Sequence, residues 1–562
     1  MRVKTNLRLY LIALIATLGL VVSSCGVDDA DDGATSTSEV VELSVSSAQE
    51  DGEADESQAD GEADGDLLLG TAGSWTPEDV EGISVDESNA IPVIDQALAE
   101  DRVFEDYWAW DWWPVRTRSG EVAEIDGYQI AIALTAPADI LPGKRHDIAT
   151  HRYGLSSDGG QTWELGGEVF GAEDPLGSRQ WAGSAMYDED ENRLYAFYTI
   201  AGETGDPVEE AAASQEPDEE TEIGPSGGPI RPGISYRQQM GLATADVVTG
   251  DDGVSFENWT DHEVLFNGSD TDFYAATEGT AGGAGNIDAF RDPWFYQDPD
   301  TGEEYVLFTA TMPQAECDGD GVVGIARATS DDLREYEILP PLLDGHCVNN
   351  ELERPHIIDQ DGNTYLLFTT HSHTFRDGTN GPEGYYGFVA PDLFGPYEPL
   401  NDTGLVLANP DDQPYQAYSW MGLENGIVTS FFQFFDLPEG VELSYVGSQA
   451  PEFQLDHFGG TFAPSLALEF DGATTRLVEE LDPGVLVRAA AQTDGGEDDG
   501  TGGAEDTGTD GDATDGDGAT DGQGDAGDGQ GDAGDGDDST TPQGGVDAGF
   551  GGAASILDDE GP

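Results

Sequence analysis

The aromatic residues of this chain are concentrated in its middle, which limits where a folded core can form. Residues 26–94 are rich in Asp, Glu, Ser and Gly, and residues 486–562 consist largely of repeated Gly, Asp, Thr and Ala. Segments of this composition bury too little apolar surface to offset the entropy lost on ordering. We therefore predict a disordered acidic linker over residues 26–94, one folded domain over residues 95–485 and a disordered tail over residues 486–562.

The pattern inside the middle region is typical of an all-β fold. Short apolar or alternating runs recur between turn pairs such as Asp-Gly, Gly-Gly and Asn-Gly, and no long amphipathic helix stands out. Many short strands indicate a propeller, a large sandwich or a β-helix. Because no strict sequence period is visible, a β-helix is disfavoured and a β-propeller is the preferred prediction. The clearest predicted strands are Tyr128–Leu134, Arg193–Thr199, Glu304–Thr309, Asn363–Thr369 and Gly426–Phe432.

The charge of the chain excludes some partners. There are 115 acidic and 20 basic residues, which gives a formal net charge of -95. Such a charge repels nucleic acid and anionic lipid surfaces, so no nucleic-acid partner is expected. Lys4 and Lys144 are the only lysines in the sequence. An acidic surface almost without lysine predicts adaptation to high salt, and an ordinary acidic secreted protein is the alternative.

The N-terminus is typical of an export signal. Arg2, Lys4 and Arg8 precede an apolar run from Leu9 to Val22. That run of about 14 residues is shorter than the roughly 20 that a membrane-spanning helix needs. The following Val-Ser-Ser-Cys-Gly resembles the lipobox of bacterial lipoproteins, which predicts a signal peptide over residues 1–25 and lipidation of Cys25. The protein is then extracellular and held at the cell surface by lipid, or later shed; a plain secretory signal is the alternative.

Two further cysteines, Cys317 and Cys347, complete the set. An exported protein enters an oxidising compartment, so this pair predicts a disulfide, with two buried free thiols as the alternative.

Three acidic residues stand among aromatic, Pro and Arg residues instead of among other surface acids: Asp111, Asp292 and Glu353. Aromatic surroundings raise the pKa of a carboxyl group, and a neighbouring Arg keeps another carboxyl ionised. A retaining glycosidase needs two such carboxyls, one as nucleophile and one as acid/base. The alternative is that each is a buried, hydrogen-bonded carboxylate with a structural role.

The order of several motifs resembles that of glycoside hydrolase family 68, the levansucrases and inulosucrases, and favours the branch of Gram-negative bacteria and halophiles. The resemblance spans about residues 95–485. It rests on Trp110-Asp111-Trp112-Trp113-Pro114-Val115, Arg145-His146-Asp147, Gln180-Trp181-Ala182-Gly183-Ser184, Phe290-Arg291-Asp292-Pro293, Glu353-Arg354-Pro355-His356, Tyr386-Gly387-Phe388-Val389, Leu393-Phe394-Gly395-Pro396-Tyr397 and Gly459-Gly460-Thr461-Phe462-Ala463-Pro464.

The resemblance implies a five-bladed β-propeller with an acidic axial pocket. It implies that Asp111 is the nucleophile, that Glu353 is the acid/base and that Asp292 stabilises the transition state. A ping-pong reaction through a fructosyl–Asp111 intermediate follows from these roles. The substrate-binding residues implied by the matching motifs are Trp110, Trp181, Arg291, Glu351, Arg354, His373 and Tyr418.

The chain departs from the family pattern at three positions. Ala182 replaces a serine that often holds the sugar or the nucleophile. Thr309 stands where many members carry an acidic residue, and we expect it to weaken support of the acid/base network. Asn350 replaces the acidic residue of the calcium site in Gram-positive relatives, so a fixed structural calcium ion is not expected. The eight histidines show no metal-ligand spacing, and no cofactor is predicted.

The resemblance predicts a levansucrase-like enzyme that cleaves sucrose and transfers the fructosyl unit to fructan or to water. Two alternatives on the same scaffold are an inulosucrase and a mainly hydrolytic sucrase. An alternative from another class is a non-catalytic, glycan-binding surface lipoprotein. Sucrose and fructan acceptors are the expected partners, membrane association is expected only through the lipid anchor, and the protein is expected to be a monomer.

Overall fold

The computed structural model describes residues 72–171, 175–214, 216, 233–250, 253–277, 288–313, 321–345, 347–376, 378–438 and 440–488. The predicted signal peptide, Cys25, the linker up to residue 71, Cys317 and the predicted tail beyond residue 488 lie outside the described residues. Among the described helices, none is long and apolar enough to cross a membrane.

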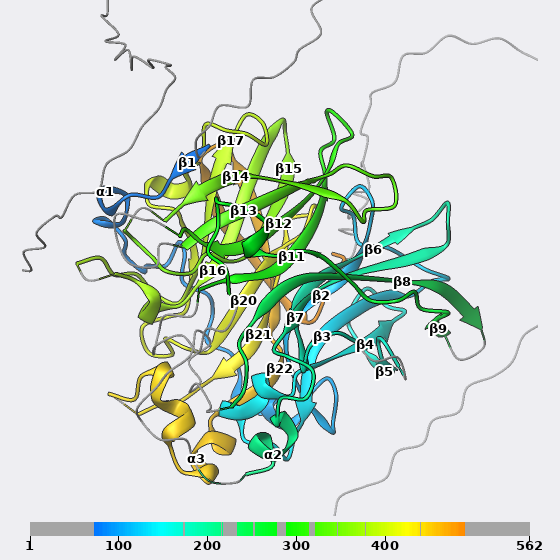
Figure 1. Ribbon diagram of the computed structural model, residues 1–562. Coiled ribbons are helices and arrows are strands. Elements are labelled where there is room, and N and C mark those ends of the chain that lie inside the picture. The colour runs from blue at the N-terminus through cyan, green and yellow to red at the C-terminus, as the bar shows by residue number, and fades with distance from the viewer. Residues whose placement is uncertain are drawn as a thin grey trace, which may run out of the picture. The chain divides into compact units, whose positions relative to one another are not determined.

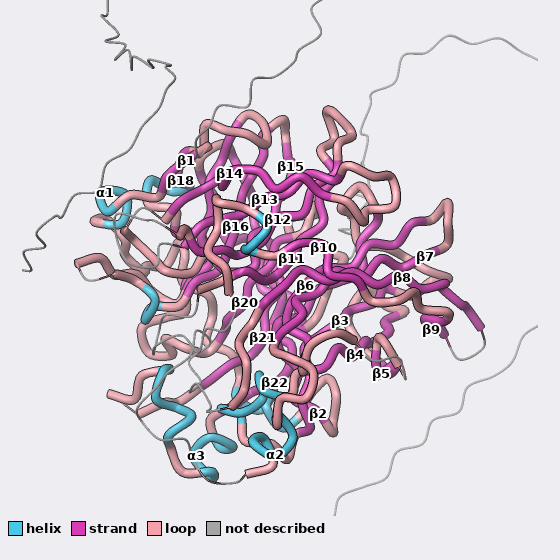
Figure 2. The backbone as a smooth tube through the Cα atoms, in the orientation of Figure 1, coloured by secondary structure: helices cyan, strands magenta, loops and turns pink. Residues whose placement is uncertain are grey.

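The described chain is built from antiparallel meanders of β-strands (Figures 1 and 2). Five meanders follow one another, and we call them blades 1 to 5. Blade 1 contains β2 (Tyr107–Thr117), β3 (Gln129–Pro137), β4 (Thr150–Ser156) and β5 (Glu164–Glu168). Blade 2 contains β6 (Arg179–Asp188), β7 (Arg193–Ala201), β8 (Gln238–Gly250), β9 (Gly253–Glu257) and β10 (Glu263–Phe266).

The remaining blades repeat this arrangement. Blade 3 contains β11 (Phe290–Gln297), β12 (Glu304–Thr311), β13 (Gly321–Ala328) and β14 (Tyr336–Asp344). Blade 4 contains β15 (Glu353–Gln360), β16 (Asn363–Thr370), β17 (Gly384–Ala390), β18 (Glu398–Pro399) and β19 (Leu405–Ala408). Blade 5 contains β20 (Ala417–Gly422), β21 (Ile427–Phe434), β22 (Phe458–Phe462), β23 (Pro464–Asp471) and β24 (Thr474–Pro483).

Helices are short and lie in the connections. The described α-helices are α1 (Pro77–Val80), α2 (Val208–Ala212) and α3 (Pro451–Asp456). The 3-10 turns are η1 (Gln96–Glu100), η2 (Pro142–Asp147), η3 (Gly268–Asp270), η4 (Ser372–Thr374), η5 (Leu400–Asp402) and η6 (Leu443–Ser448).

The first strands of the five blades form a closed ring. β2 pairs in parallel with β6, through Val115 and Ala185, so that blades 1 and 2 share one nine-stranded sheet. β6 lies against β11, β11 against β15, β15 against β20, and β20 returns to β2. A ring of blades with their first strands at the centre is a five-bladed β-propeller, as the sequence resemblance implies.

Aromatic packing joins the last blade to the first. The indole nitrogen of Trp112 in β2 donates a hydrogen bond to the carbonyl of Ser430 in β21 at 2.8 Å. The Trp112 ring also stacks on Phe462 of β22, with centroids 4.1 Å apart. Trp112 is 1% exposed, so this contact lies in the core where blade 5 meets blade 1. Buried aromatic pairs add stability beyond their buried area.

The five strands predicted most clearly from the sequence are confirmed, and each is the second strand of a blade. They correspond to β3, β7, β12, β16 and β21. Second strands are covered on both faces by neighbouring blades, so nearly all of their residues are buried and the apolar runs are long. First strands are interrupted by polar site residues, which obscures their pattern.

The packed region begins before residue 95, where the sequence predicted the domain boundary. β1 (Gly73–Ser74) pairs in parallel with β14. Trp75 is 0% exposed, and its indole nitrogen donates to the carbonyl of Thr403 at 3.2 Å. The prediction of a disordered linker up to residue 94 is therefore wrong for residues 72–94. The composition of residues 72–94 did not reveal this packing, because a two-residue strand and one tryptophan change the composition of an acidic segment very little.

Candidate active site

Each first strand is interrupted at the same point. The register of pairing shifts near one end of all five strands, where one or two residues bulge out of the ladder. Bulges redirect side chains and are common beside active sites. The shifts lie between Trp110 and Trp112, Trp181 and Gly183, Arg291 and Trp294, Glu353 and His356, and Tyr418 and Met421.

Four of the bulged residues adopt a left-handed backbone. The φ angles are 34° at Asp111, 61° at Asp292, 52° at Arg354 and 61° at Ser419. Such conformations are uncommon for residues other than glycine and cost on the order of 1–3 kcal/mol each. The surrounding fold must therefore hold these four residues in place, and all four line one cavity.

The β6 bulge depends on a glycine instead. A Cβ atom added to Gly183 would lie 2.0 Å from the carbonyl oxygen of Phe197. Only glycine permits this approach of β6 to β7. Gly183 thus explains part of the Trp181-Ala182-Gly183 motif as a backbone requirement, and it places Trp181 and Ala182 at the cavity.

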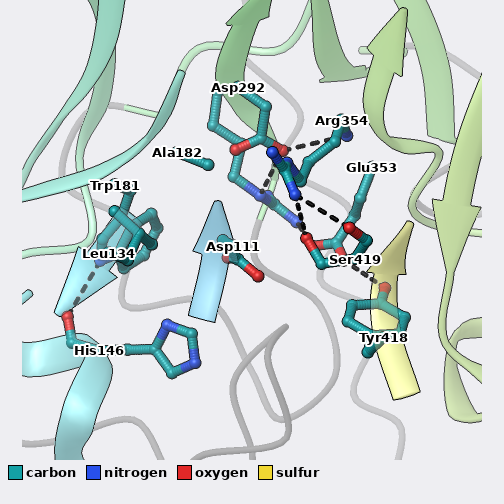
Figure 3. Close-up of a pocket in the computed structure, with 11 residues that line it drawn as sticks. Asp111, Leu134, His146, Trp181, Ala182, Asp292, Glu353, Arg354, Tyr418 and Ser419 are labelled. Carbon is teal, nitrogen blue, oxygen red and sulfur yellow. Dashed lines mark hydrogen bonds and ion pairs between the residues drawn. The ribbon is translucent and has the colours of Figure 1, made fainter. Parts of the chain in front are cut away.

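The redirected side chains converge on a cavity at the centre of the ring (Figure 3). Figure 3 shows Asp111 in the middle, Trp181 on one side, and Glu353 and Tyr418 on the other. The cavity combines carboxylates, guanidinium groups and aromatic walls, which suits a sugar. Its lining residues are Asp111, Leu134, His146, Trp181, Ala182, Arg291, Asp292, Glu353, Arg354, Tyr418 and Ser419.

Asp111 is the carboxylate in the middle of this arrangement. Part of its surface stays open to the cavity, while the surrounding protein displaces water from it. Burial raises the pKa of Asp111, and the negative charge of Glu353 adds to that rise. The positive charge of Arg354, a hydrogen bond from Ser419 and the positive charge of Arg145 oppose it in part. These groups favour the ionised carboxylate, which is the form that a nucleophile requires.

Arg291 gathers three carboxyl groups. Its Nη2 atom lies 2.6 Å from Oε1 of Glu353 and 3.2 Å from Oε2 of Glu351. Its Nε atom lies 3.7 Å from Oδ2 of Asp292. All four side chains are buried, so one guanidinium balances only part of the charge that three ionised carboxylates would carry.

Because one guanidinium does not balance three carboxylates, the carboxyl groups around Arg291 differ in how readily they hold a proton. Burial raises the pKa of Glu351 to about 8 and that of Asp292 to about 6. Burial also acts on Glu353, but Arg291, His371 and a hydrogen bond from Tyr418 outweigh it and lower the pKa of Glu353. Glu351 and Glu353 are hydrogen-bonded to each other, so the pair holds one proton at neutral pH.

Arg354 connects three blades. Its guanidinium donates hydrogen bonds to the carbonyl oxygens of Ser419 in β20 and Trp112 in β2, both at 3.0 Å. Its backbone amide donates to Thr309 at 3.0 Å and lies 3.3 Å from Oδ2 of Asp292. Arg354 therefore fixes the bulges of β2 and β20 relative to its own strand, β15.

The sequence-predicted residues fall into two groups. Asp111, Asp292, Glu353, Trp181, Arg291, Arg354 and Tyr418 line the cavity. Trp110, Glu351 and His373 do not line it: Trp110 is fully buried beside His146, Glu351 lies beneath Arg291, and His373 stacks on His371. Roles for these three residues in binding sugar stay predictions.

Some residues at the site were not selected from the sequence. Ser419 and Leu134 line the cavity, and His371 lies 3.8 Å from Glu353. Ser419 directly follows Tyr418 in the bulge of β20, so the selection of Tyr418 from the sequence could also have identified Ser419. Leu134 ends a strand predicted from its apolar run, and His371 lies two residues before His373, which was selected instead. Only the fold shows that Leu134 and His371 lie at the site.

The predicted disulfide is only partly described. Cys347 is disulfide-bonded, whereas Cys317, the predicted partner, lies outside the described residues. The pairing of the two cysteines stays a prediction.

Comparison with known proteins gives the same result as the motifs. The family model described as Levansucrase/Invertase matches residues 69–320 and 311–484. A levansucrase of Zymomonas mobilis is 32% identical over 434 residues, which cover 72% of this chain and 90% of that protein. An extracellular sucrase of the same species is 29% identical over 408 residues, which cover 68% and 87%.

A solved structure extends the likeness to the fold. It is the inulosucrase of Halalkalicoccus jeotgali bound to kestose, 39% identical, with a TM-score of 0.65, covering 73% of this chain and 96% of that one. The residues matched by the family model extend over all five blades. The chain therefore belongs to the levansucrase/invertase family, glycoside hydrolase family 68, and is a sucrose-acting fructosyltransferase or sucrase.

Proposed function

We propose that the protein cleaves sucrose at Asp111 and transfers the fructosyl unit to a growing levan chain, with water as a competing acceptor. The observation that carries this proposal is the convergence of Asp111, Asp292 and Glu353 on one cavity from the bulges of three separate blades. Asp111 and Asp292 themselves, and Arg354 directly after Glu353, adopt left-handed backbone conformations, a strain that glycan binding alone would not require.

In the first half of the reaction, a carboxylate oxygen of Asp111 attacks the anomeric carbon of the fructosyl unit. The bond from that carbon to the glucose oxygen breaks, and the oxygen takes a proton from Glu353. The Glu351–Glu353 pair holds one proton at neutral pH, mainly on Glu351, whose pKa is the raised one; this proton passes to Glu353 as Glu353 protonates the glucose oxygen. Asp292, ionised above about pH 6, stabilises the positive charge that develops on the fructosyl ring.

In the second half, Glu353 acts as a base. It takes a proton from a hydroxyl group of the acceptor, whose oxygen bonds to the anomeric carbon while the bond to Asp111 breaks. Two displacements at one carbon retain its configuration, and glucose leaves before the acceptor enters, which gives ping-pong kinetics.

Levan is proposed as the main product because the curated relatives include levansucrases. Inulin is the second candidate, and the observation that favours it is the 39% identity to the inulosucrase of Halalkalicoccus jeotgali. The two products differ in which hydroxyl of the terminal fructosyl unit attacks, namely O6 in levan and O1 in inulin.

The linkage test uses the full chain with sucrose and analyses the polymer by carbon-13 NMR and methylation. Mostly 2,6-linked fructosyl units support the proposal, and mostly 2,1-linked units replace it with inulin synthesis. Free fructose equal to glucose, with no polymer, assigns the protein as a hydrolytic sucrase.

Export of the protein is supported by the extracellular sucrase among its relatives. Anchoring through Cys25 is a proposal from the sequence alone. A Cys25→Ser variant tests it: the wild-type protein is expected in the membrane fraction and the variant in the medium, and equal release of both would contradict anchoring.

A further inference from the structure

His371 lies between two buried carboxylates, outside the set of residues that the sequence singled out. On one side is Glu383, whose side chain is 1% exposed. Nδ1 of His371 hydrogen-bonds to Oε2 of Glu383 at 2.7 Å. The other oxygen of Glu383 accepts hydrogen bonds from the backbone amide and the hydroxyl of Ser372, at 2.9 and 3.0 Å. Glu383 is thus held by three donors.

On the other side is the proposed acid/base. Nε2 of His371 lies 3.8 Å from Oε2 of Glu353, the oxygen that also accepts a hydrogen bond from the Tyr418 hydroxyl. The His371 ring lies flat on the Tyr418 ring, with centroids 3.7 Å apart and planes 10° from parallel. His371 therefore holds Tyr418 in place by stacking, and its Nε2 edge faces Glu353.

The orientation of His371 depends on Glu383. A carboxylate at Nδ1 selects the ring form that carries a proton there and favours the doubly protonated cation. We propose that Glu383 is a positioning residue for catalysis: it holds His371 as an oriented cation beside Glu353, and the pair sets the pH range over which Glu353 donates its proton. This inference rests on the proposed role of Glu353 in sucrose cleavage.

The surroundings agree with a charged His371. The charged and titratable groups that face it are Glu383 before β17, Glu353 and Glu351 around the start of β15, Tyr418 in β20, and His373 in η4. Burial works against the charged ring, but Glu383, Glu353 and Glu351 outweigh it and raise the pKa of His371 above its ordinary value. Arg291 holds the other oxygen of Glu353.

The sign of the expected effect follows from this chain of charges. Glu383→Gln removes the anion that favours protonated His371, so His371 loses its charge at lower pH. Glu353 then loses a neighbouring cation and keeps its proton to higher pH. Because a protonated acid is needed for glucose to leave, the alkaline limb of the kcat/KM profile moves upward.

The first experiment measures glucose release from sucrose by the full chain across pH. We expect the alkaline limb to move up by about one pH unit in Glu383→Gln, a shift typical of losing one nearby charge. Glu383→Asp keeps the negative charge but moves it away from His371, because its side chain is shorter by one methylene group. We expect a smaller shift in the same direction, and this variant replaces Glu383→Gln in the test if Glu383→Gln does not fold. Glu424→Gln is the matched control, because Glu424 is a largely buried carboxyl that lines a different cavity, with Arg116 and Asp359.

An equal loss of activity at every pH, with the limb unmoved, would overturn the proposal and leave Glu383 a structural residue. A limb shift of the same size in Glu424→Gln would overturn it as well. The unfolding temperatures of all variants show whether a substitution changes activity alone or also the stability of the fold.

A second readout does not depend on catalysis. In protein labelled with nitrogen-15 histidine, the His371 signals are identified by their loss in His371→Gln. We expect them to titrate above pH 6.5 in the wild type and at lower pH in Glu383→Gln. Unchanged titration in Glu383→Gln would contradict the proposal even in an active enzyme. If the expected titrations appear but the wild-type protein releases no glucose from sucrose, the coupling of His371 to Glu383 is confirmed and the proposed function is refuted.

Discussion

Thr309 donates a hydrogen bond from its hydroxyl group to Oδ2 of Asp292 at 2.9 Å. The same hydroxyl oxygen accepts a hydrogen bond from the backbone amide of Arg354 in the next blade, at 3.0 Å. The sequence led us to expect that Thr309 weakens the acid/base network. The structure places it instead as a link between blades 3 and 4 that supports the carboxylate of Asp292.

Thr309→Val removes this link while keeping the shape of the side chain. Losing a donor to the ionised form raises the pKa of Asp292 above its value of about 6, so less of it is ionised at a given pH. We expect kcat/KM to fall about tenfold at neutral pH, which is roughly the 1.5 kcal/mol of a hydrogen bond to a charged group. We also expect the acidic limb of the profile to move to higher pH.

Thr135→Val is the control for that experiment. Thr135 is 0% exposed in β3, the second strand of blade 1, and its hydroxyl donates to the carbonyl of Thr150 at 2.9 Å. It contacts no site carboxylate, so its profile should match the wild type. A Thr309→Val profile with an unmoved acidic limb would argue against support of Asp292 by Thr309.

Arg354→Lys tests the connection of three blades. A lysine has a single charged nitrogen and does not reproduce the bonds to both Ser419 and Trp112. Replacement should reduce kcat/KM by about 100-fold, corresponding to roughly 3 kcal/mol for two charge-assisted hydrogen bonds. Steady-state kinetics with sucrose measure this, and Arg193→Lys, at a partly exposed pair with Asp246, is the control. Near-normal kinetics in Arg354→Lys would mean that its charge alone matters.

Trp75→Ala tests where the folded domain begins. Trp75 packs against Phe368, Phe375, Tyr386 and Phe388 in blade 4 and is 0% exposed. Removing a fully buried tryptophan side chain should lower the free energy of unfolding by about 3–5 kcal/mol. Urea denaturation of the variant and of Val93→Ala, at an exposed position, makes the comparison. Equal stability of the two variants would return the boundary to residue 95.

Salt should stabilise the protein. Exposed and partly exposed arginines of the described chain already pair with acids, as in Arg193–Asp246, Arg327–Glu337 and Arg476–Glu469, so the remaining acids repel one another. Lowering salt from about 1 M to about 0.1 M lengthens the screening distance from about 3 to about 10 Å. The unfolding temperature should fall accordingly. A constant unfolding temperature would contradict salt adaptation.

The three carboxylates that line the cavity could be selected from the sequence because each lies inside a local motif. Asp111, Asp292 and Glu353 stand at or beside a bulge, and each has Trp, Arg or Pro close by in the sequence. Glu383 and His371 could not be predicted in this way. They are twelve residues apart and carry no motif of their own. His371 follows β16 and Glu383 precedes β17, so they reach Glu353 through the pairing of β15, β16 and β17 within blade 4.

The fold, too, has parts that the sequence predicted and parts that it did not. The second strands of the blades were predictable because both of their faces are buried and their apolar runs are long. The two-residue strand β1 was not, because its place beside β14 depends on a pairing across more than half of the folded chain. Local pattern identifies strands, whereas closure of the ring depends on contacts distant in sequence.

The most direct test of the central claim measures glucose and fructose released from sucrose by the full chain, in high salt, beside Asp111→Asn. Asp246→Asn, at a partly exposed carboxylate paired with Arg193, is the control. We expect glucose to run ahead of fructose in the wild type and in the control. In Asp111→Asn, at unchanged stability, the release of both sugars should fall by about four orders of magnitude, as for loss of a catalytic nucleophile. Substantial glucose release by folded Asp111→Asn would contradict a reaction through a fructosyl–Asp111 intermediate.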